Sequence, residues 1–157
     1  MADIRRAEAR DLPGIRKLLF QVNQLHADGR PDLFKSGGIK YTDDELRLIL
    51  ADDRRPVWVY APEGEVLGYV FCVFEETRET PSLRPVRTLY IDDLCVDEAA
   101  RGRGLGRMLF QHVTAEARRL GCYEITLNVW EGNDSARHFY ESLGMTPKST
   151  QMELILP

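Results

Sequence analysis

The six residues Arg101-Gly102-Arg103-Gly104-Leu105-Gly106 decide the fold class of this 157-residue chain. They follow an apolar, strand-like run from Leu89 to Val96 and open a helix-like run that ends at Gly121. A glycine-rich turn between a strand and a helix presents free backbone N–H groups at the positive end of the helix dipole. Glycine lets the backbone approach an anion without an intervening side chain. The turn therefore predicts a binding site for a phosphate-bearing ligand.

Three alternative interpretations of this turn compete. A dinucleotide-binding fold requires Gly-x-Gly-x-x-Gly early in a doubly wound sheet, but Arg107 stands where the third glycine belongs and a single further helix follows. A P-loop requires Gly-Lys-Ser/Thr, which the chain lacks at this turn. A purely structural turn without a ligand is the third alternative, and three glycines alternating with arginines count against it.

The composition is that of an ordinary globular protein, with 43% hydrophobic and 29% charged residues and a net charge of −4. The length fits one domain spanning residues 1–157. An acidic balance argues against a nucleic-acid-binding protein. We expect no contact with a membrane, because apolar runs are short and residues 1–6 lack the apolar core of a signal peptide. The odd number of cysteines, without a Cys-x-x-Cys pair, indicates a reducing compartment, the cytoplasm.

Apolar periodicity and turn residues predict the element order β-α-α-β-β-β-α-β-α-β. Because strands outnumber helices and two of them form a hairpin around Pro62-Glu63-Gly64, the sheet should be mixed. The strands that flank the glycine-turn helix should be parallel and joined by a right-handed crossover. The predicted strands begin at Ile4 and cover 57–60, 66–74, 88–96, 123–129 and 151–156, and the predicted helices cover 11–25, 42–50, 105–120 and 134–143, with loops at 26–39 and 77–85.

Two segments resemble a known family. Arg101-x-x-Gly104-x-Gly106 after a strand is similar to the pyrophosphate motif of the GNAT superfamily of acetyl-CoA-dependent N-acetyltransferases. Asn133, Ala136 and Tyr140 lie at i, i+3 and i+7 on one face of a predicted helix and resemble the second cofactor segment of that family. The resemblance implies an α+β, GNAT-like acyltransferase fold, whose mixed, mostly antiparallel sheet has a central parallel pair that splays at the cofactor site. The segment 90–96 is most similar to diamine and spermidine/spermine acetyltransferases, which carry an acidic pair on this strand.

The resemblance implies that acetyl-CoA binds at the strand end, the glycine turn and the later helix. Transfer in this family is direct, in a ternary complex. By resemblance, Tyr140 is the acid that protonates the leaving thiolate, and a backbone N–H near Cys95 or Val96 polarises the thioester carbonyl. The alternative for Tyr140 is a packing role in an amphipathic core helix. The expected cofactor-binding residues are Leu94, Cys95, Val96, Arg101, Gly102, Arg103, Gly104, Leu105, Gly106, Arg107, Asn133, Ala136 and Tyr140.

The acceptor amine must lose a proton, because an alkylammonium with a pKa of about 10 is not nucleophilic at neutral pH. Asp92 and Asp93 are adjacent, so we expect them on opposite faces of a strand, with Asp92 on the face of Leu94 and Val96. Asp92 is the expected base, directly or through a water molecule. In the alternative, both carboxylates only hold an ammonium group. Cys95 is interpreted as a small buried side chain, not as a nucleophile. The histidine spacing predicts no metal site.

By resemblance, the acceptor pocket is framed by residues 25–39 and 75–86. Both segments are rich in carboxylates, which suits a small cationic amine such as a polyamine or an aminoglycoside. A protein or peptide N-acetyltransferase and a non-catalytic acyl-CoA-binding domain are the alternatives. The apolar segment 152–156 is suited to extend across a homodimer, which is common in this family. The expected acceptor contacts are His26, Asp32, Phe34, Glu75, Asp92 and Trp130.

Overall fold

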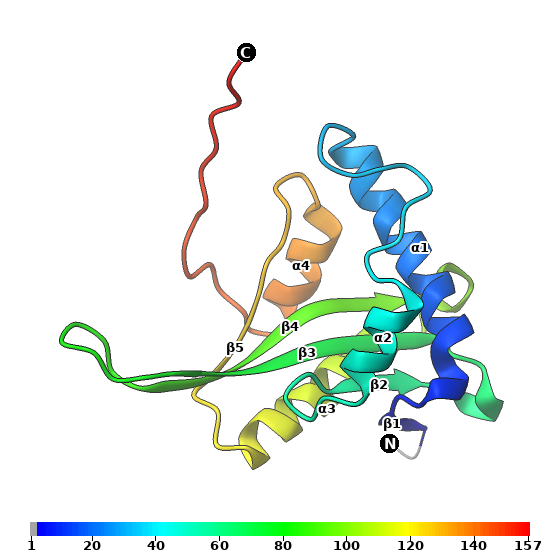
Figure 1. Cartoon of the computed structure of the whole chain (residues 1–157), viewed down its shortest axis with the longest axis horizontal. Coiled ribbons are helices and arrows are strands. Elements are labelled where there is room, and N and C mark those ends of the chain that lie inside the picture. The colour runs from blue at the N-terminus through cyan, green and yellow to red at the C-terminus, as the bar shows by residue number, and fades with distance from the viewer. Residues whose placement is uncertain (1–2) are drawn as a thin grey trace.

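The computed structural model describes residues 3–157 and contains one five-stranded sheet in the order β1-β2-β3-β4-β5 (Figure 1). The strands β1 to β4 pair antiparallel, and β4 and β5 pair parallel. The predicted mixed sheet and its parallel pair around the glycine-turn helix are therefore confirmed. The strands are β1 (Ile4–Arg6), β2 (Val57–Tyr60), β3 (Gly68–Thr77), β4 (Val86–Val96) and β5 (Glu124–Leu127).

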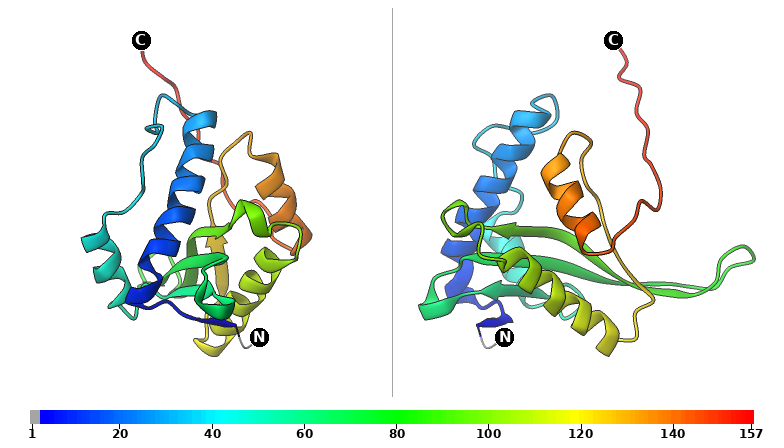
Figure 2. Two further views of the ribbon diagram at one scale, coloured as in Figure 1. Left: turned by 90° about the vertical axis from the view of Figure 1, so that its right-hand side faces the viewer. Right: turned by 180° about the vertical axis from the view of Figure 1, so that it is seen from behind.

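Helices cover both faces of the sheet. The helices α1 (Leu12–Gly29) and α2 (Asp43–Leu50) pack on one face, and α3 (Leu105–Arg119) and α4 (Asp134–Ser142) lie on the other (Figure 2). The predicted capping box of α2 is present, because Thr42 and Glu45 each bond the backbone N–H of the other. Three short 3-10 turns complete the elements, η1 (Ala9–Asp11), η2 (Pro62–Gly64) and η3 (Glu98–Ala100).

The alternation of β3 divides the core in two. Tyr69 and Phe71 point to the α1/α2 face, whereas Val70 and Cys72 point to the α3 face. Each set meets the apolar face of the helices above it, so the sheet is buried on both sides along its centre. At its far end the β3–β4 ribbon continues through Glu75 to Thr77 and projects from the body (Figure 1).

The strands β4 and β5 part in the middle of the sheet. Their pairing runs from Thr88 opposite Glu124 to Ile91 opposite Leu127, and the residues of β4 after Ile91 have no partner in β5. The predicted splay of the parallel pair is confirmed. It leaves the β5-facing side of residues 92–96 open for backbone hydrogen bonds to a ligand.

A β-bulge at Asp92 corrects one prediction. Phe71 pairs with Asp93 and Cys72 with Ile91, so Asp92 is an extra residue in β4. The bulge interrupts the alternation of side chains, and both carboxylates therefore contact tyrosines on the α1/α2 side. The expectation that Asp92 and Asp93 lie on opposite faces, with Asp92 on the side of Leu94 and Val96, was wrong.

Three differences from the predicted elements exceed one or two residues or remove an element. The first helix continues to Gly29, so His26 lies in the helix and the loop begins at Arg30. The strand β3 extends to Thr77, beyond the last apolar residue, because the ribbon there is exposed on both faces and needs no apolar alternation. The predicted strand over residues 151–156 is not formed within the described chain, since no strand of residues 3–157 pairs with it. No helix in the described chain has the length and apolarity needed to cross a bilayer.

Candidate active site

The glycine turn between η3 and α3 is shaped for an anion. Gly102 and Gly104 have φ values of 81° and 75°, a left-handed conformation that strains other residues. A Cβ added to either residue would meet no neighbouring atom within 4 Å, so the space above the backbone is open. Gly104 is the N-cap of the 15-residue α3. Within residues 3–157, no backbone N–H of residues 101–107 donates a hydrogen bond to another group of the chain.

Three arginines surround this turn. Arg101, Arg103 and Arg107 are exposed, and none of them forms an ion pair with a carboxylate of the described chain. Free guanidinium groups beside free N–H groups at a helix N-terminus match the charge and donor needs of a pyrophosphate. The turn therefore fits the diphosphate of a coenzyme A thioester, as the sequence predicted.

The helix α4 presents the second predicted segment. The Asn133 side chain accepts a hydrogen bond from the Ala136 N–H at 3.2 Å, so Asn133 is the N-cap. The Tyr140 ring packs against Phe110 and Phe139, with ring centroids 6.2 and 5.0 Å apart. Its hydroxyl has no hydrogen-bond partner among residues 3–157, and burial raises its pKa well above the ordinary value. Tyr140 is thus a protonated phenol with a free donor.

Cys95 lies in the open stretch of β4 between two α3-facing residues, Leu94 and Val96. It is buried in the α1/α2 core, where its Sγ lies 3.9 Å from the carbonyl of Leu18. Burial, and secondarily the charge of Asp93, raise the pKa of the Cys95 thiol to about 12. A thiol that stays protonated is a poor nucleophile. The geometry thus supports the packing role predicted for Cys95.

Two tyrosine–carboxylate pairs lie side by side near the splay. The Tyr41 hydroxyl donates to Asp92 at 2.6 Å, and the Tyr69 hydroxyl donates to Asp93 at 2.6 Å. Lys40 forms an ion pair with Asp92 at 3.1 Å. Asp92 is therefore held by a cation and a hydroxyl, whereas Asp93 has a hydroxyl partner and no ion pair among the described residues.

The Asp93 carboxylate has a shifted pKa. Burial raises the pKa of Asp93 to about 6, although its hydrogen bond with Tyr69 and the charge of Lys40 both oppose the shift. The charge of Asp93 in turn contributes to the raised pKa of Tyr140. A carboxylate that gains a proton near neutral pH and a phenol that carries one therefore lie within electrostatic range of each other.

An aromatic cluster, formed by His26, Phe34 and Trp130, joins the end of α1 to the loop before α4. Phe34 lies 5.0 Å from His26 and 5.5 Å from Trp130, measured between ring centroids. Burial, and next the charge of Lys40, lower the pKa of His26, so its imidazole is neutral at pH 7. The structure thus brings together three of the predicted acceptor residues, from segments about a hundred positions apart in the chain.

The other predicted acceptor residues are placed differently. The Asp32 carboxylate is bound by Arg30 through two hydrogen bonds of 2.9 Å, and the Arg30 guanidinium also lies 5.9 Å from the Trp130 ring centroid. Glu75 lies on the projecting β3–β4 ribbon, paired with Thr88, and the structure does not bring it to the aromatic cluster. Asp92 is near Lys40, as described above.

Sequence reasoning missed three residues of this region, Lys40, Tyr41 and Tyr69, and placed Arg30 in the acceptor segment 25–39 without counting it among the expected contacts. Tyr41 directly precedes the capping box of α2, and the sequence around Tyr69 indicates a core residue of an apolar strand. A polar ring at a core position, which needs a buried partner for its hydroxyl, is the signal that was available for Tyr69. The ion pairs of Arg30 with Glu153 and of Lys40 with Asp92 join distant segments and leave no local pattern.

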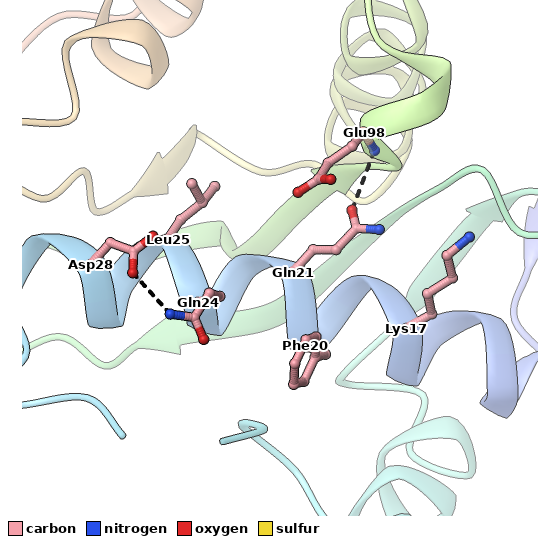
Figure 3. A pocket seen from close by; sticks show the side chains of 7 residues that line it. All are labelled: Lys17, Phe20, Gln21, Gln24, Leu25, Asp28 and Glu98. Carbon is pink, nitrogen blue, oxygen red and sulfur yellow. Dashed lines mark hydrogen bonds between the residues drawn. The ribbon is translucent and has the colours of Figure 1, made fainter. Parts of the chain in front are cut away.

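A shallow pocket lies along α1, next to the turn that leads into α3 (Figure 3). Gln21 accepts a hydrogen bond from the Glu98 N–H at 3.3 Å, and Gln24 donates one to Asp28 at 2.9 Å. The bond between Gln21 and Glu98 ties α1 to the start of the glycine turn. None of the individually predicted site residues lines this pocket, although Leu25 and Asp28 belong to the predicted acceptor segment 25–39. Its lining is Lys17, Phe20, Gln21, Gln24, Leu25, Asp28 and Glu98.

The comparisons with known proteins agree with this geometry. The model of the acetyltransferase (GNAT) family matches residues 19–145. The 5-NmdU N-acetyltransferase of Pseudomonas phage PaMx11 is 33% identical, with 68% of this chain and 72% of that protein covered. The probable glucosamine 6-phosphate N-acetyltransferase 2 of Oryza sativa subsp. japonica is 30% identical, with 96% and 86% covered. A crystal structure of a variant of the BH1408 protein from Bacillus halodurans superposes with a TM-score of 0.94 at 31% identity, covering 98% and 99%.

The glycine turn, the splayed strands and the family match all lead to the same assignment. The turn has the open backbone that a coenzyme A diphosphate would require, and the splay leaves backbone groups open beside it. The chain belongs to the GNAT family and is an acetyl-CoA-dependent N-acetyltransferase.

Proposed function

We propose that the protein transfers the acetyl group of acetyl-CoA to a primary amine of a small cationic acceptor, by direct attack in a ternary complex. The observation that carries this proposal is the carboxylate pair Asp92 and Asp93 beside the splay, of which Asp93 lies within electrostatic range of Tyr140. Paired negative charge attracts an ammonium group, and one carboxylate of the pair has a pKa suited to remove its proton.

Acetyl-CoA supplies the acetyl thioester that the amine attacks. We propose that the turn residues 101–107 hold its diphosphate through their backbone N–H groups and the three arginines. Leu94, Cys95 and Val96 would offer backbone groups at the open side of β4, and Asn133 and Ala136 would border the ligand on α4. The side chain of Cys95 takes no chemical part in this arrangement.

The structure favours Asp93 over Asp92 as the base. The Asp92 carboxylate is engaged by Lys40 and Tyr41, so its oxygens are less available to an incoming ammonium group. Asp93, with a pKa of about 6, is ionised at pH 7.5 and can accept a proton there. Asp93 takes a proton from the acceptor ammonium, and Tyr140 delivers one to the leaving sulfur. Asp92 and Lys40 position the acceptor next to Asp93 and Tyr140.

The aromatic cluster supports an acceptor with a cationic group. Rings of Phe34 and Trp130 meet edge to face, and Arg30 already places a guanidinium near the Trp130 ring. An ammonium group gains comparable electrostatic attraction from an aromatic face. Neutral His26 beside these rings offers a hydrogen-bond acceptor for a second amine of a polyamine.

An amino sugar phosphate is the second candidate acceptor. Two cations, Arg30 and Lys40, flank the aromatic cluster and the carboxylate pair, and a phosphate would bind such groups. The rice relative is named for glucosamine 6-phosphate. Against this candidate, both cations are already paired with carboxylates, Arg30 with two of them.

The three cysteines support a cytoplasmic location, which we propose for this reaction. Cys72, Cys95 and Cys122 are free thiols in the structure, and two of them are buried. Such thiols persist in a reducing compartment.

A steady-state acceptor screen tests the proposed function. The purified protein with acetyl-CoA is assayed for thiol release against polyamines, aminoglycosides, amino sugar phosphates, lysine analogues and short peptides. We expect the highest kcat/KM for a small polyamine or aminoglycoside. A preference for glucosamine 6-phosphate supports the second candidate, a preference for peptides supports a protein acetyltransferase, and no release with any amine would indicate a non-catalytic acyl-CoA-binding domain.

A further inference from the structure

A primary amine of the chain itself lies beside the carboxylate pair. The Lys40 Nζ is 3.1 Å from Oδ2 of Asp92, one of the two carboxylates proposed to attract the acceptor ammonium. It is also 5.4 Å from the centroid of the Tyr41 ring. A carboxylate and an aromatic face both attract an alkylammonium group. The Lys40 side chain therefore has the functional group, and meets the kind of partners, that we propose for the acceptor.

The backbone next to Lys40 is anchored at this place. Tyr41 donates its hydroxyl to Asp92 at 2.6 Å, and its ring stacks on that of Phe71 with centroids 5.8 Å apart. Thr42 follows as the N-cap of α2, where its side chain accepts the Glu45 N–H. These contacts fix the end of the segment between α1 and α2, so they hold Lys40 within reach of the carboxylate pair.

The charge of Lys40 acts on groups in both parts of the proposed acceptor site. Burial raises the pKa of Asp93, whereas the Tyr69 hydrogen bond and next the charge of Lys40 oppose that rise. Burial lowers the pKa of His26, and the charge of Lys40 adds to the lowering. Lys40 is therefore within electrostatic range of both the proposed base and the aromatic cluster.

The ion pair between Lys40 and Asp92 can open at little cost. The Lys40 side chain is 42% exposed, and ion pairs at such positions contribute little to stability because water screens them. A lysine side chain is also a flexible four-carbon stem with a compact charge at its end. The Lys40 ammonium can thus exchange Asp92 for Asp93, the adjacent carboxylate.

We propose that Lys40 is a self-acetylation site, whose amine takes the acetyl group of acetyl-CoA bound to the same chain when no external acceptor is present. This inference rests on the proposed function, because it uses the same thioester, base and acid. The Lys40 ammonium gives one proton to Asp93, and its nitrogen forms a bond to the thioester carbonyl carbon. The carbon–sulfur bond breaks, its electron pair stays on sulfur, and Tyr140 protonates the sulfur. A second proton from the nitrogen replaces the one that Tyr140 gave, so the products are acetyl-lysine, coenzyme A and the proton on Asp93.

The modification changes the charge that an acceptor meets. Acetylation converts the Lys40 ammonium into a neutral amide, which cannot form an ion pair with Asp92. Asp92 then keeps the Tyr41 hydroxyl as its partner. Self-acetylation would therefore remove one positive charge from the acceptor side of the site.

Peptide mapping by mass spectrometry tests the site. The full chain is incubated with acetyl-CoA in an amine-free buffer and then digested with trypsin, which does not cleave after an acetylated lysine, so acetyl-Lys40 appears in a peptide spanning residues 36–47. Lys17 is the matched internal control, because it is an exposed lysine that forms an ion pair with Asp97 at 3.0 Å, away from the carboxylate pair. We expect acetylation of Lys40 to be roughly 100-fold faster than that of Lys17. Equal rates at the two lysines would overturn the proposal.

Two further measurements separate catalysed self-acetylation from other routes. Asp93→Asn and Tyr140→Phe, each verified as folded by calorimetric binding of coenzyme A, should lower the rate at Lys40 toward that at Lys17. An unchanged rate in both variants would show an uncatalysed reaction and contradict the proposal. The rate per chain should also be independent of protein concentration. A rate that rises in proportion to the concentration would show attack by a different copy, and would contradict acetylation within one chain.

The outcome of this experiment is separate from that of the acceptor screen. A small amine substrate found in the screen, together with equal acetylation of Lys40 and Lys17, would overturn this inference and leave the proposed function standing. Acetylation of Lys40 at the expected rate, with no amine accepted in the screen, would support this inference and contradict the small cationic acceptor.

Discussion

Asp92 and Asp93, neighbours in β4, each accept a hydrogen bond from a tyrosine hydroxyl on the same side of the sheet, at 2.6 Å in both cases. In a regular strand such neighbours would point to opposite faces. The bulge at Asp92 brings them together and gives them different partners, with Lys40 ion-paired to Asp92. Asp93, which has no ion-pair partner among the described residues and a pKa of about 6, can exchange a proton near neutral pH.

The first prediction concerns the base. Asp93→Asn should lower kcat/KM by roughly 100- to 10,000-fold, because an amide cannot take the ammonium proton. The acid limb of the wild-type pH–rate profile, with an apparent pKa near 6, should disappear in this variant. Steady-state rates between pH 5 and 9 measure both effects. Asp92→Asn is the control and should raise the acceptor KM while keeping the acid limb; the reverse pattern would make Asp92 the base.

The second prediction concerns stability and pH. The pKa of Asp93 is about 6 in the folded chain against an ordinary 3.8, so the protonated form stabilises the fold. This stabilisation is complete below pH 3.8 and is lost as the pH rises through 6. This loss lowers the free energy of unfolding by about 2 kcal/mol after allowance for partial exposure, and it should be absent in Asp93→Asn. In urea unfolding, the free energy of unfolding of the variant should therefore rise relative to that of the wild type between pH 4.5 and pH 7.5. The same difference in free energy between variant and wild type at both pH values would contradict the shifted pKa.

The third prediction concerns the acid. Tyr140→Phe should lower kcat by roughly ten- to ten-thousand-fold if the phenol protonates the leaving thiolate. The ring contacts with Phe110 and Phe139 remain, and the hydroxyl has no partner among the described residues, so the melting temperature should stay close to that of the wild type. Calorimetric binding of coenzyme A should be unchanged. Full activity in this variant would assign Tyr140 a packing role.

The fourth prediction concerns the glycine turn. Gly104→Ala forces a Cβ onto a residue with φ of 75° and places it in the open space above the turn. We expect a loss of about 1 kcal/mol of stability and at least a tenfold higher KM for acetyl-CoA. Gly64→Ala is a matched control, since Gly64 has φ of 83° and equally open surroundings in η2, which lies outside the site. It should show the same destabilisation and an unchanged KM; equal KM values in both variants would remove the turn from cofactor binding.

The features that sequence predicted well are local ones. The glycine turn, the capping box of α2 and the N-cap at Asn133 are each written in a few consecutive residues, because backbone conformation and nearest-neighbour hydrogen bonds determine them. The parallel pairing of β4 and β5 followed from the helix between them, since a strand–helix–strand unit has one favoured geometry.

The features that sequence missed depend on distant partners. The bulge at Asp92 arises from the register of β3 against β4, and two adjacent aspartates give no sign of it. The partners of the carboxylates, Tyr41, Tyr69 and Lys40, come from segments whose own patterns indicate a loop and a core strand. The segment 151–156 carries a strand pattern, yet within residues 3–157 no strand pairs with it.

Because of the bulge, deletion of a single residue has different consequences at different positions of β4. Ten pairs tie β3 to β4, and Asp92 is the β4 residue in this stretch that belongs to none of them. Removing Asp92 would give a regular β3–β4 ladder, and the side chains of Leu89 and Cys95 would stay on their own sides of the sheet. Removing a paired residue such as Tyr90 would instead move the side chains between that residue and the bulge to the opposite face. Loss of this one codon is therefore the deletion in β4 that the fold would tolerate best, and it would leave Asp93 without its neighbour.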